Sequence, residues 1–179
     1  MSDHAHDKAP HRPIRAAVVT LSDKASAGLR ADASGPMLVE LLRDVGANVG
    51  DAVVISDDQP RIEETLVHIA DSGTVDLILT TGGTGLAPRD HTPEATVAVA
   101  DRLAPGFAEA MRAASLAVTP RAMLSRAVAA VRGSTLIINM PGSPKACREH
   151  FAVIAPVLDH AVETLRGESY ECATTDKEG

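Results

Sequence analysis

The sequence predicts an α/β domain with a mostly parallel sheet, helices on both faces and an antiparallel hairpin at one sheet edge. Short apolar runs rich in β-branched residues alternate with segments whose apolar side chains recur at helical spacing. Such alternation is typical of parallel strands joined by helical crossovers. Two later apolar runs are separated only by residues 132–134, which predicts a tight turn between antiparallel strands.

Three strand-helix units follow one another along the first half of the chain. Residues 14–21 predict a buried strand, followed by a long polar loop and a helix from Pro36 that stops near Gly46. Residues 49–55 predict a second strand, with a helix from Pro60. Residues 76–81 predict a third strand, and a helix is expected near Pro93, with Thr92 as its N-cap.

The C-terminal part adds the hairpin and a long helix. Strands are predicted at residues 127–131 and 135–140, and a helix at 144–165 in which Pro156 should cause a kink or a break. Residues 14–167 are therefore expected to form one domain. Residues 1–13 and 168–179 are polar and lack apolar periodicity, so we expect them to be disordered tails.

Composition excludes several classes of function. The net charge of -7 offers no basic surface for a nucleic-acid backbone, and two Phe and one Tyr cannot form a base-stacking platform. No apolar run is long enough to span a membrane. Two cysteines are too few for a disulfide framework, which fits a reducing compartment. We therefore expect a cytoplasmic protein with neither nucleic acid nor membrane as a partner.

The segment at residues 80–96, TTGGTGLAPRDHTPEAT, is the strongest candidate for a ligand site. Its glycines come directly after the third strand and ahead of a helix, where open α/β sheets bind ligands and where backbone N–H groups can approach a phosphate. A tight turn that needs positive φ is the alternative explanation. Nearby hydroxyls, together with Arg89 and Asp90, favour the ligand site. The spacing matches neither a Walker loop nor the dinucleotide fingerprint.

Two acidic turns are expected at the same end of the sheet. Asp57 follows the second strand and Asp90 follows the third. Two carboxylates on neighbouring strand ends can hold Mg²⁺ against phosphate groups, because this ion takes one or two carboxylates and completes its shell with phosphate and water oxygens. The alternative is that Asp57 or Asp58 caps the helix that begins near Pro60.

These motifs and several others resemble those of a known family over residues 14–167. The family comprises Mog-type molybdopterin adenylyltransferases, MoaB proteins and the G domains of gephyrin-like proteins. The matching segments are Ser22-Asp23, residues 32–36 (DASGP), 80–85 (TTGGTG), 89–96 (RDHTPEAT), 105–107 (PGF), Ser125-Arg126 and 139–145 (NMPGSPK).

The resemblance implies a homotrimer that binds molybdopterin and adenylates it with Mg-ATP, and it names a molybdenum insertase as a candidate partner. Asp57 and Asp90 fall on the family's catalytic and magnesium-binding positions. The nucleotide-binding positions it implies are Thr81, Gly82, Gly83, Thr84 and Gly85. The implied pterin-binding positions are Ser22, Asp23, Ser34, Gly35, Ser125, Arg126, Pro141, Gly142, Ser143 and Lys145.

Two other functions remain open within the same resemblance. A MoaB-like protein would bind molybdopterin without transferring an adenylyl group, and a gephyrin-like module would serve as a trimeric scaffold. Arg89-Asp90 and residues 92–96 look closer to the adenylyltransferase pattern, which favours the enzyme. By position alone, Arg126 could be a structural ion-pair partner and Lys145 an ordinary exposed lysine.

Overall fold

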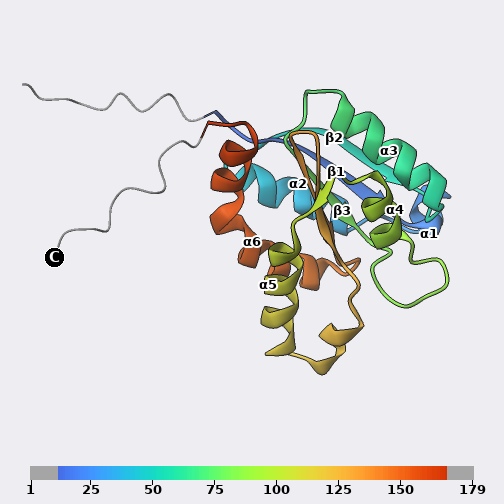
Figure 1. Cartoon of the computed structure of the whole chain (residues 1–179). Helices are drawn as coiled ribbons and strands as arrows, with labels where there is room; N and C mark the ends of the chain where they lie inside the picture. The colour runs from blue at the N-terminus through green and yellow to red at the C-terminus, as the bar shows by residue number, and fades with distance from the viewer. Residues whose placement is uncertain (1–11, 169–179) are drawn as a thin grey trace, which may run out of the picture.

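The computed structural model describes residues 12–168 as one α/β domain with a six-stranded sheet (Figure 1). Of the expected tails at residues 1–13 and 168–179, residues 1–11 and 169–179 lie outside the described residues. The strands are β1 (Arg15–Leu21), β2 (Asn48–Ile55), β3 (Leu77–Thr81), β4 (Arg102–Leu103), β5 (Ala129–Arg132) and β6 (Thr135–Met140). The helices are α1 (Asp23–Ser26), α2 (Ser34–Asp44), α3 (Gln59–Asp71), α4 (Thr92–Val99), α5 (Pro105–Leu116), a 3-10 helix η1 (Pro120–Leu124) and α6 (Pro144–Leu165).

The sheet order is β2-β1-β3-β6-β5-β4. The first four strands are parallel, whereas β5 runs antiparallel to both β6 and β4. This confirms the predicted fold class and the antiparallel pair at one edge. The hairpin is not the outermost element, however, because the two-residue strand β4 pairs with β5 beyond it. So short a strand carries no periodic signal that a sequence pattern could reveal.

Two apolar cores cover the two faces of the sheet. Along β1, Ala16 and Val18 belong to the core under α2, α5 and α6, while Ala17 and Val19 belong to the core under α3 and α4. Figure 1 shows these helices on opposite sides of the sheet. Because successive side chains of a strand point to opposite faces, a strand that is buried on both sides is apolar throughout.

Three local predictions differ from the structure in informative ways. The helix α2 begins at Ser34 rather than Pro36, because the Asp32 carboxylate accepts the backbone N–H groups of Ser34 and Gly35 at 3.1 and 3.0 Å. The break expected at Pro156 does not occur, and α6 is one helix of 22 residues. Pro156 and the residue four positions before it are exposed, so water can solvate the carbonyl that loses its helical partner.

The third difference fixes the glycine segment in place. Thr92 is the first residue of α4 rather than its N-cap. Its hydroxyl donates instead to the Gly82 carbonyl oxygen at 2.9 Å, and the Gly83 carbonyl oxygen accepts its backbone N–H at 3.2 Å. The start of α4 is thereby tied directly to the end of β3.

The amino ends of the parallel strands are closed by an ion-pair network. Asp76, whose side chain is 1% exposed, pairs with Arg15 at 2.7 Å and with Arg166 at 2.6 Å. Arg166 also donates to the carbonyl oxygens of Arg12 and Pro13, which ties both ends of the described chain together at this end of the sheet. Within residues 12–168, no helix is long and apolar enough to cross a membrane.

Candidate active site

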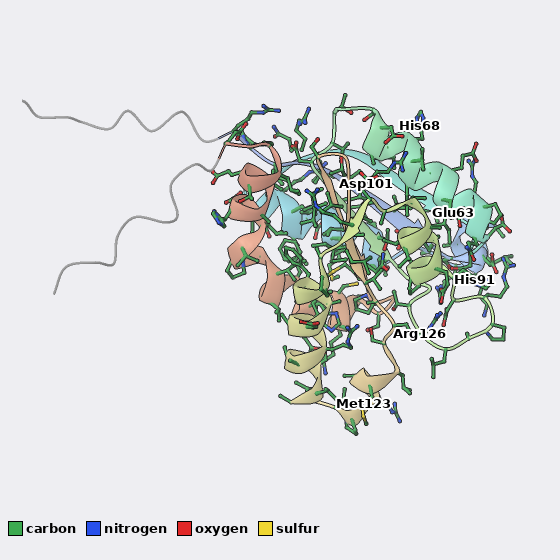
Figure 2. The ribbon with its side chains drawn as sticks, viewed as in Figure 1. Glu63, His68, His91, Asp101, Met123 and Arg126 are labelled. Carbon is green, nitrogen blue, oxygen red and sulfur yellow. The ribbon has the colours of Figure 1, made fainter. Side chains whose placement is uncertain are left out.

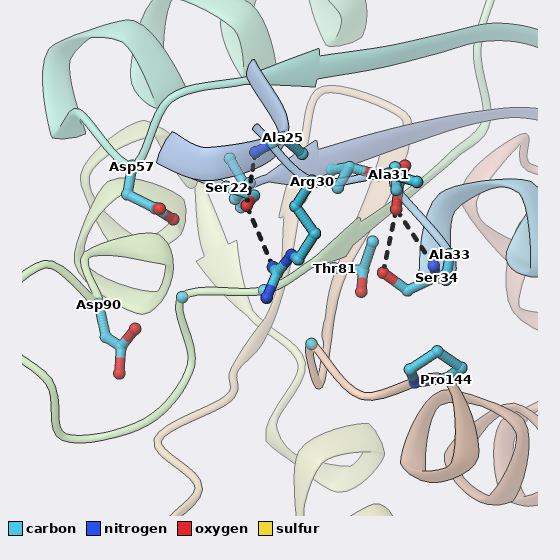
Figure 3. Close-up of a pocket in the computed structure, with 16 residues that line it drawn as sticks. Ser22, Ala25, Arg30, Ala31, Ala33, Ser34, Asp57, Thr81, Asp90 and Pro144 are labelled. Atoms are coloured by element: carbon cyan, nitrogen blue, oxygen red, sulfur yellow. Dashed lines mark hydrogen bonds between the residues drawn. The ribbon is translucent and has the colours of Figure 1, made fainter. Parts of the chain in front are cut away.

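A cavity of about 500 Å³ opens at the carboxyl ends of the parallel strands. Its lining includes a residue that follows each of these four strands: Ser22, Asp57, Gly82 and Gly142. The other lining residues are Thr20, Leu21, Ala25, Arg30, Ala31, Asp32, Ala33, Ser34, Thr81, Gly83, Asp90 and Pro144. Figure 3 shows Asp57 and Asp90 on two different loops at one side of this cavity. The site therefore lies where open α/β sheets bind small molecules.

The glycine segment forms one wall of the cavity and needs glycine for steric reasons. Gly82 has a φ of 105° and Gly83 a φ of 62°, in the region that L side chains rarely adopt. A Cβ at Gly82 would lie 2.3 Å from the Leu21 carbonyl oxygen, and one at Gly83 would lie 2.3 Å from the Thr92 hydroxyl. The segment is therefore a tight turn that needs positive φ, as in the alternative explanation. The same turn also brings the backbone to the surface of the cavity.

Asp57 faces the cavity because its neighbour performs the capping. The Asp58 carboxylate accepts the backbone N–H of Arg61 at the start of α3. One Asp57 oxygen, Oδ2, accepts the backbone N–H of Asp23 at 2.8 Å, and no hydrogen bond to Oδ1 occurs within residues 12–168. Burial raises the pKa of the Asp57 carboxyl, and the nearby Asp23 and Asp90 carboxylates add to this effect despite the hydrogen bond.

Asp90 is held in a similar way and offers a similar free oxygen. Its Oδ2 accepts the Ala87 backbone N–H at 2.9 Å, while Oδ1 has no hydrogen-bond partner among the described residues. No group of three or more His, Cys, Asp or Glu that could hold a metal occurs in the described part of the chain. A pair of carboxylates suits Mg²⁺, which binds to one or two carboxylates and takes its remaining ligands from phosphate and water.

Asp23 lies behind Asp57 and does not line the cavity. Its backbone N–H donates to Asp57, and its Oδ1 accepts the Asp57 backbone N–H at 3.0 Å. Arg89 binds the same carboxylate through two hydrogen bonds of 2.9 and 2.8 Å. The hydrogen bonds from Arg89 hold the pKa of Asp23 below its usual value. Asp23 therefore joins the loop that carries Asp90 to the loop that carries Asp57.

The glycine segment separates the main cavity from a second one. Thr84, Gly85, Ser125 and Pro141 line a largely apolar cavity of about 270 Å³ between η1 and the start of α6. The predicted nucleotide-binding residues thus fall into two hollows, with Thr81, Gly82 and Gly83 lining the main cavity and Thr84 and Gly85 lining the second.

Arg126, which is labelled in Figure 2, holds the loop that bears Asp90 by binding its carbonyl oxygen. Its backbone N–H donates to the Thr84 carbonyl oxygen at 2.9 Å and its Nε to the Gly85 carbonyl oxygen at 2.7 Å. The two terminal nitrogens bind the Asp90 carbonyl oxygen and the Glu94 carboxylate. The guanidinium is therefore directed at the protein itself, as in the structural alternative for this residue.

Only some of the remaining predicted pterin-binding residues line the main cavity. Ser22, Ser34 and Gly142 line the main cavity, whereas Gly35, Ser143 and Lys145 do not. Ser143 caps α6 by accepting the Ala146 backbone N–H at 3.2 Å. The Lys145 side chain is 83% exposed and lies 3.9 Å from Glu149.

Sequence reasoning did not predict Arg30 and Thr20 as site residues, and it placed Asp32 only within the segment at residues 32–36. All three line the main cavity. Asp32 accepts the Thr20 hydroxyl at 2.7 Å in addition to the N–H groups at the start of α2. An acidic residue two positions before a helix is a signal that could have been found. No local pattern distinguishes Arg30 from an ordinary loop arginine.

Residues 17–160 match the family model described as "Probable molybdopterin binding domain". The chain belongs to the molybdopterin-binding domain family. Relatives of the same family include the molybdopterin adenylyltransferase of Helicobacter pylori (strain ATCC 700392 / 26695), which is 40% identical over 156 residues, or 86% of this chain and 89% of that protein.

Other members support the same placement. The molybdopterin adenylyltransferase of Escherichia coli (strain K12) is 46% identical over 138 residues, covering 76% of this chain and 71% of its own. The crystal structure of the molybdopterin biosynthesis enzyme MoaB from Thermus thermophilus superposes with a TM-score of 0.82 at 46% identity, covering 88% of this chain and 99% of that one. The resemblance and the fold expected from the sequence are both confirmed.

Proposed function

We propose that this protein transfers the adenylyl group of ATP to the terminal phosphate of molybdopterin and releases pyrophosphate. The observation that carries the proposal is the meeting of Asp57, Asp90 and the glycine segment in one cavity. Relatives named molybdopterin adenylyltransferase are 40% and 46% identical to the chain over most of its length, which supports the same chemistry here. In this reaction a phosphate oxygen of the pterin forms a bond to the α-phosphorus of ATP, and the bond between that phosphorus and the bridging oxygen to the β-phosphate breaks.

The protein's part in this reaction is to align two phosphate groups and to balance their charge. Asp57 and Asp90 would hold magnesium, which when bound supplies positive charge that neutralises the triphosphate. The backbone of Gly82 and Gly83 borders the same space. The Gly82 N–H donates to the Met140 carbonyl oxygen at 3.3 Å, so the Gly83 N–H is the one that can approach phosphate oxygens without side-chain obstruction. Asp23 holds the loop that carries Asp57, and Arg126 holds the loop that carries Asp90.

The resemblance also leads us to propose a cytoplasmic homotrimer that passes its product to a molybdenum insertase. Physical support for assembly comes from an apolar hollow between α5 and α6, which includes Phe107 and the half-exposed Val157. Burial of such side chains at subunit contacts would add stability. Light scattering at micromolar concentration should give a mass near three chains, and a monomeric mass with full activity would contradict the trimer.

The decisive experiment mixes the purified protein with molybdopterin and ATP, with and without magnesium, and measures adenylated pterin by mass spectrometry. We expect product and pyrophosphate in equal amounts only when magnesium is present. A MoaB-like binding protein would bind molybdopterin without forming product. A scaffold would do neither, and either outcome would refute the enzyme.

A further inference from the structure

The charge of the main cavity does not match the charge of its proposed substrates. Its described lining contains the carboxylates of Asp32, Asp57 and Asp90, and Arg30 is the only Lys or Arg within it. ATP and a phosphate monoester both bring negative charge into this space. Like charges within a few ångströms of one another are costly, so the cavity needs more positive charge than it holds.

Magnesium accounts for only part of this need. Asp57 and Asp90 each keep one oxygen free of hydrogen bonds within residues 12–168, and a cation held there would serve the triphosphate. The Asp32 carboxylate is already engaged by Thr20 and by the start of α2. The monoester of the second substrate is therefore left with Arg30 as the one cationic side chain in the described lining of the cavity.

Arg30 is one of the arginines that have no carboxylate partner among the described residues. Arg15, Arg89, Arg126, Arg132 and Arg166 each form an ion pair. Within residues 12–168, Arg30 forms none, and its one hydrogen bond runs from a terminal nitrogen to the Ser22 hydroxyl at 3.2 Å. A guanidinium has five N–H donors in a planar fork that matches phosphate, so most of its donors remain for a ligand.

Arg30 reaches into the same cavity that Asp57 and Asp90 line. Figure 3 shows its side chain extending from its loop into the cavity, with Asp57 and Asp90 to one side and Ser34 and Pro144 to the other. The hydrogen bond to the Ser22 hydroxyl, which also accepts the Ala25 backbone N–H at 3.2 Å, steadies this orientation. Arg30 can thus face the acidic pair across the space in which the two phosphates must meet.

We propose that Arg30 binds the terminal phosphate monoester of molybdopterin, an inference that rests on the proposed function. Its fork would hold two phosphate oxygens and leave the third oxygen to attack ATP. The same contact would lower the repulsion between the monoester and the triphosphate.

The test compares molybdopterin with its dephosphorylated form, in binding measurements on the full chain without ATP. Arg30→Gln should raise the Kd for molybdopterin about 10- to 100-fold, the range expected for a hydrogen-bonded charge pair. The Kd for the dephosphorylated compound and the Kd for Mg-ATP, measured separately, should each change by less than about twofold. Arg30→Lys should recover part of the loss, because a lysine retains the charge but not the fork.

Arg61→Gln is the matched control, because Arg61 is an exposed arginine outside this cavity that pairs with Glu64. It should leave all three constants unchanged. Equal losses for the phosphorylated and dephosphorylated compounds after Arg30→Gln, or a loss confined to Mg-ATP, would overturn the proposal. So would a wild-type protein that does not distinguish the two pterin compounds.

Failure of the proposed function would give a different pattern. If the wild type forms no adenylated pterin while Arg30→Gln still weakens only the phosphorylated compound, the enzyme is refuted and the phosphate contact stands. If product forms and Arg30→Gln has no selective effect, the enzyme stands and the role of Arg30 is refuted.

Discussion

At the amino ends of the parallel strands Asp76 is enclosed by two arginines, whereas at the carboxyl ends Asp57 and Asp90 form no ion pair within the described residues. Asp76 accepts hydrogen bonds from the backbone and side chain of Arg15 and from the side chain of Arg166. Asp57 and Asp90 each accept a single backbone N–H. The same residue type is thus satisfied by the protein at one end and only half satisfied at the other.

The pKa shifts at the two ends have opposite signs. Burial by itself raises the pKa of the Asp76 carboxyl, but hydrogen bonds from Arg15 and Arg166 outweigh it and hold the pKa far below its usual value. At Asp57 burial outweighs the opposing hydrogen bond, so the pKa is raised. Charge at the first end is balanced by arginines of the fold, whereas no ion pair among the described residues balances the Asp57 carboxylate at the second end.

The largest effect on the free energy of unfolding is expected when the ion pairs of Asp76 are removed. Asp76→Asn leaves Arg166, whose side chain is 6% exposed, with only the more distant Glu168, at 3.7 Å, as its counter-charge. We expect a loss of about 3–5 kcal/mol in the free energy of unfolding, the usual result of removing one member of a buried pair. Urea unfolding measures it. A loss below about 1 kcal/mol would mean that the network behaves as a surface ion pair.

The corresponding change at the other end should affect catalysis instead of stability. Asp57→Asn and Asp90→Asn keep the side-chain size and remove the charge that magnesium needs. Each should lower the adenylation rate about 100-fold, equivalent to roughly 2.7 kcal/mol of barrier, while molybdopterin binding and the melting temperature stay near those of the wild type. If the wild type turns over and both variants match its rate, the assignment of these two aspartates is wrong.

A smaller loss is expected from the residue that supports the acidic loop. Arg126→Lys cannot reproduce the three directed contacts to Gly85, Asp90 and Glu94. We expect the turnover rate to fall about tenfold and hydrogen exchange in residues 85–91 to become faster. A higher KM for molybdopterin with an unchanged turnover rate and unchanged exchange would instead support direct pterin contact by Arg126.

The smallest effect is a difference in pH dependence between the two ends. The lowered pKa of Asp76 contributes stability that is present above the unfolded value of about 3.9 and is lost as pH falls toward the folded value. The destabilisation by Asp76→Asn should therefore shrink below about pH 4. The raised pKa of Asp57 has the opposite consequence. Its contribution to the free energy of unfolding is present when the pH is below the pKa in the unfolded chain, and it is lost as the pH rises through the pKa in the folded protein.

The wild type should therefore lose some stability as the pH rises above about 4, because Asp57 becomes charged. Asp57→Asn should not show this loss. Chemical unfolding at several pH values, with both variants beside the wild type, measures both slopes. Slopes of the same sign for the two variants would contradict the comparison.

Local patterns predicted the parts of the fold that depend on short segments. Alternating apolar runs predicted the parallel strands, because a strand buried on both faces must be apolar at every position. The glycine segment was found because it follows β3 directly. The expectation that Asp57 and Asp90 meet followed from a geometric rule, since parallel strands end at the same edge of a sheet.

Contacts between distant loops lay beyond those patterns. Arg89 and Asp23 are 66 positions apart, and Arg126 is 41 positions from Gly85. Neither pair shares a helix or a strand, so no periodicity links its members. The same applies to Arg30, which lines the cavity only because of the path of the loop between α1 and α2.

The sequence by itself therefore determined the main strand-helix units, the family and the end of the sheet where the candidate site lies, but not the short elements α1, β4 and η1 or the helix α5. Apolar periodicity and glycine act over a few residues, and their effects can be inferred from neighbours in the chain. The tertiary structure alone decided which charged side chains are neutralised within the protein and which still face the cavity. That outcome depends on distances of a few ångströms between residues that are far apart in the chain, and the strength of an ion pair or hydrogen bond changes steeply over such distances.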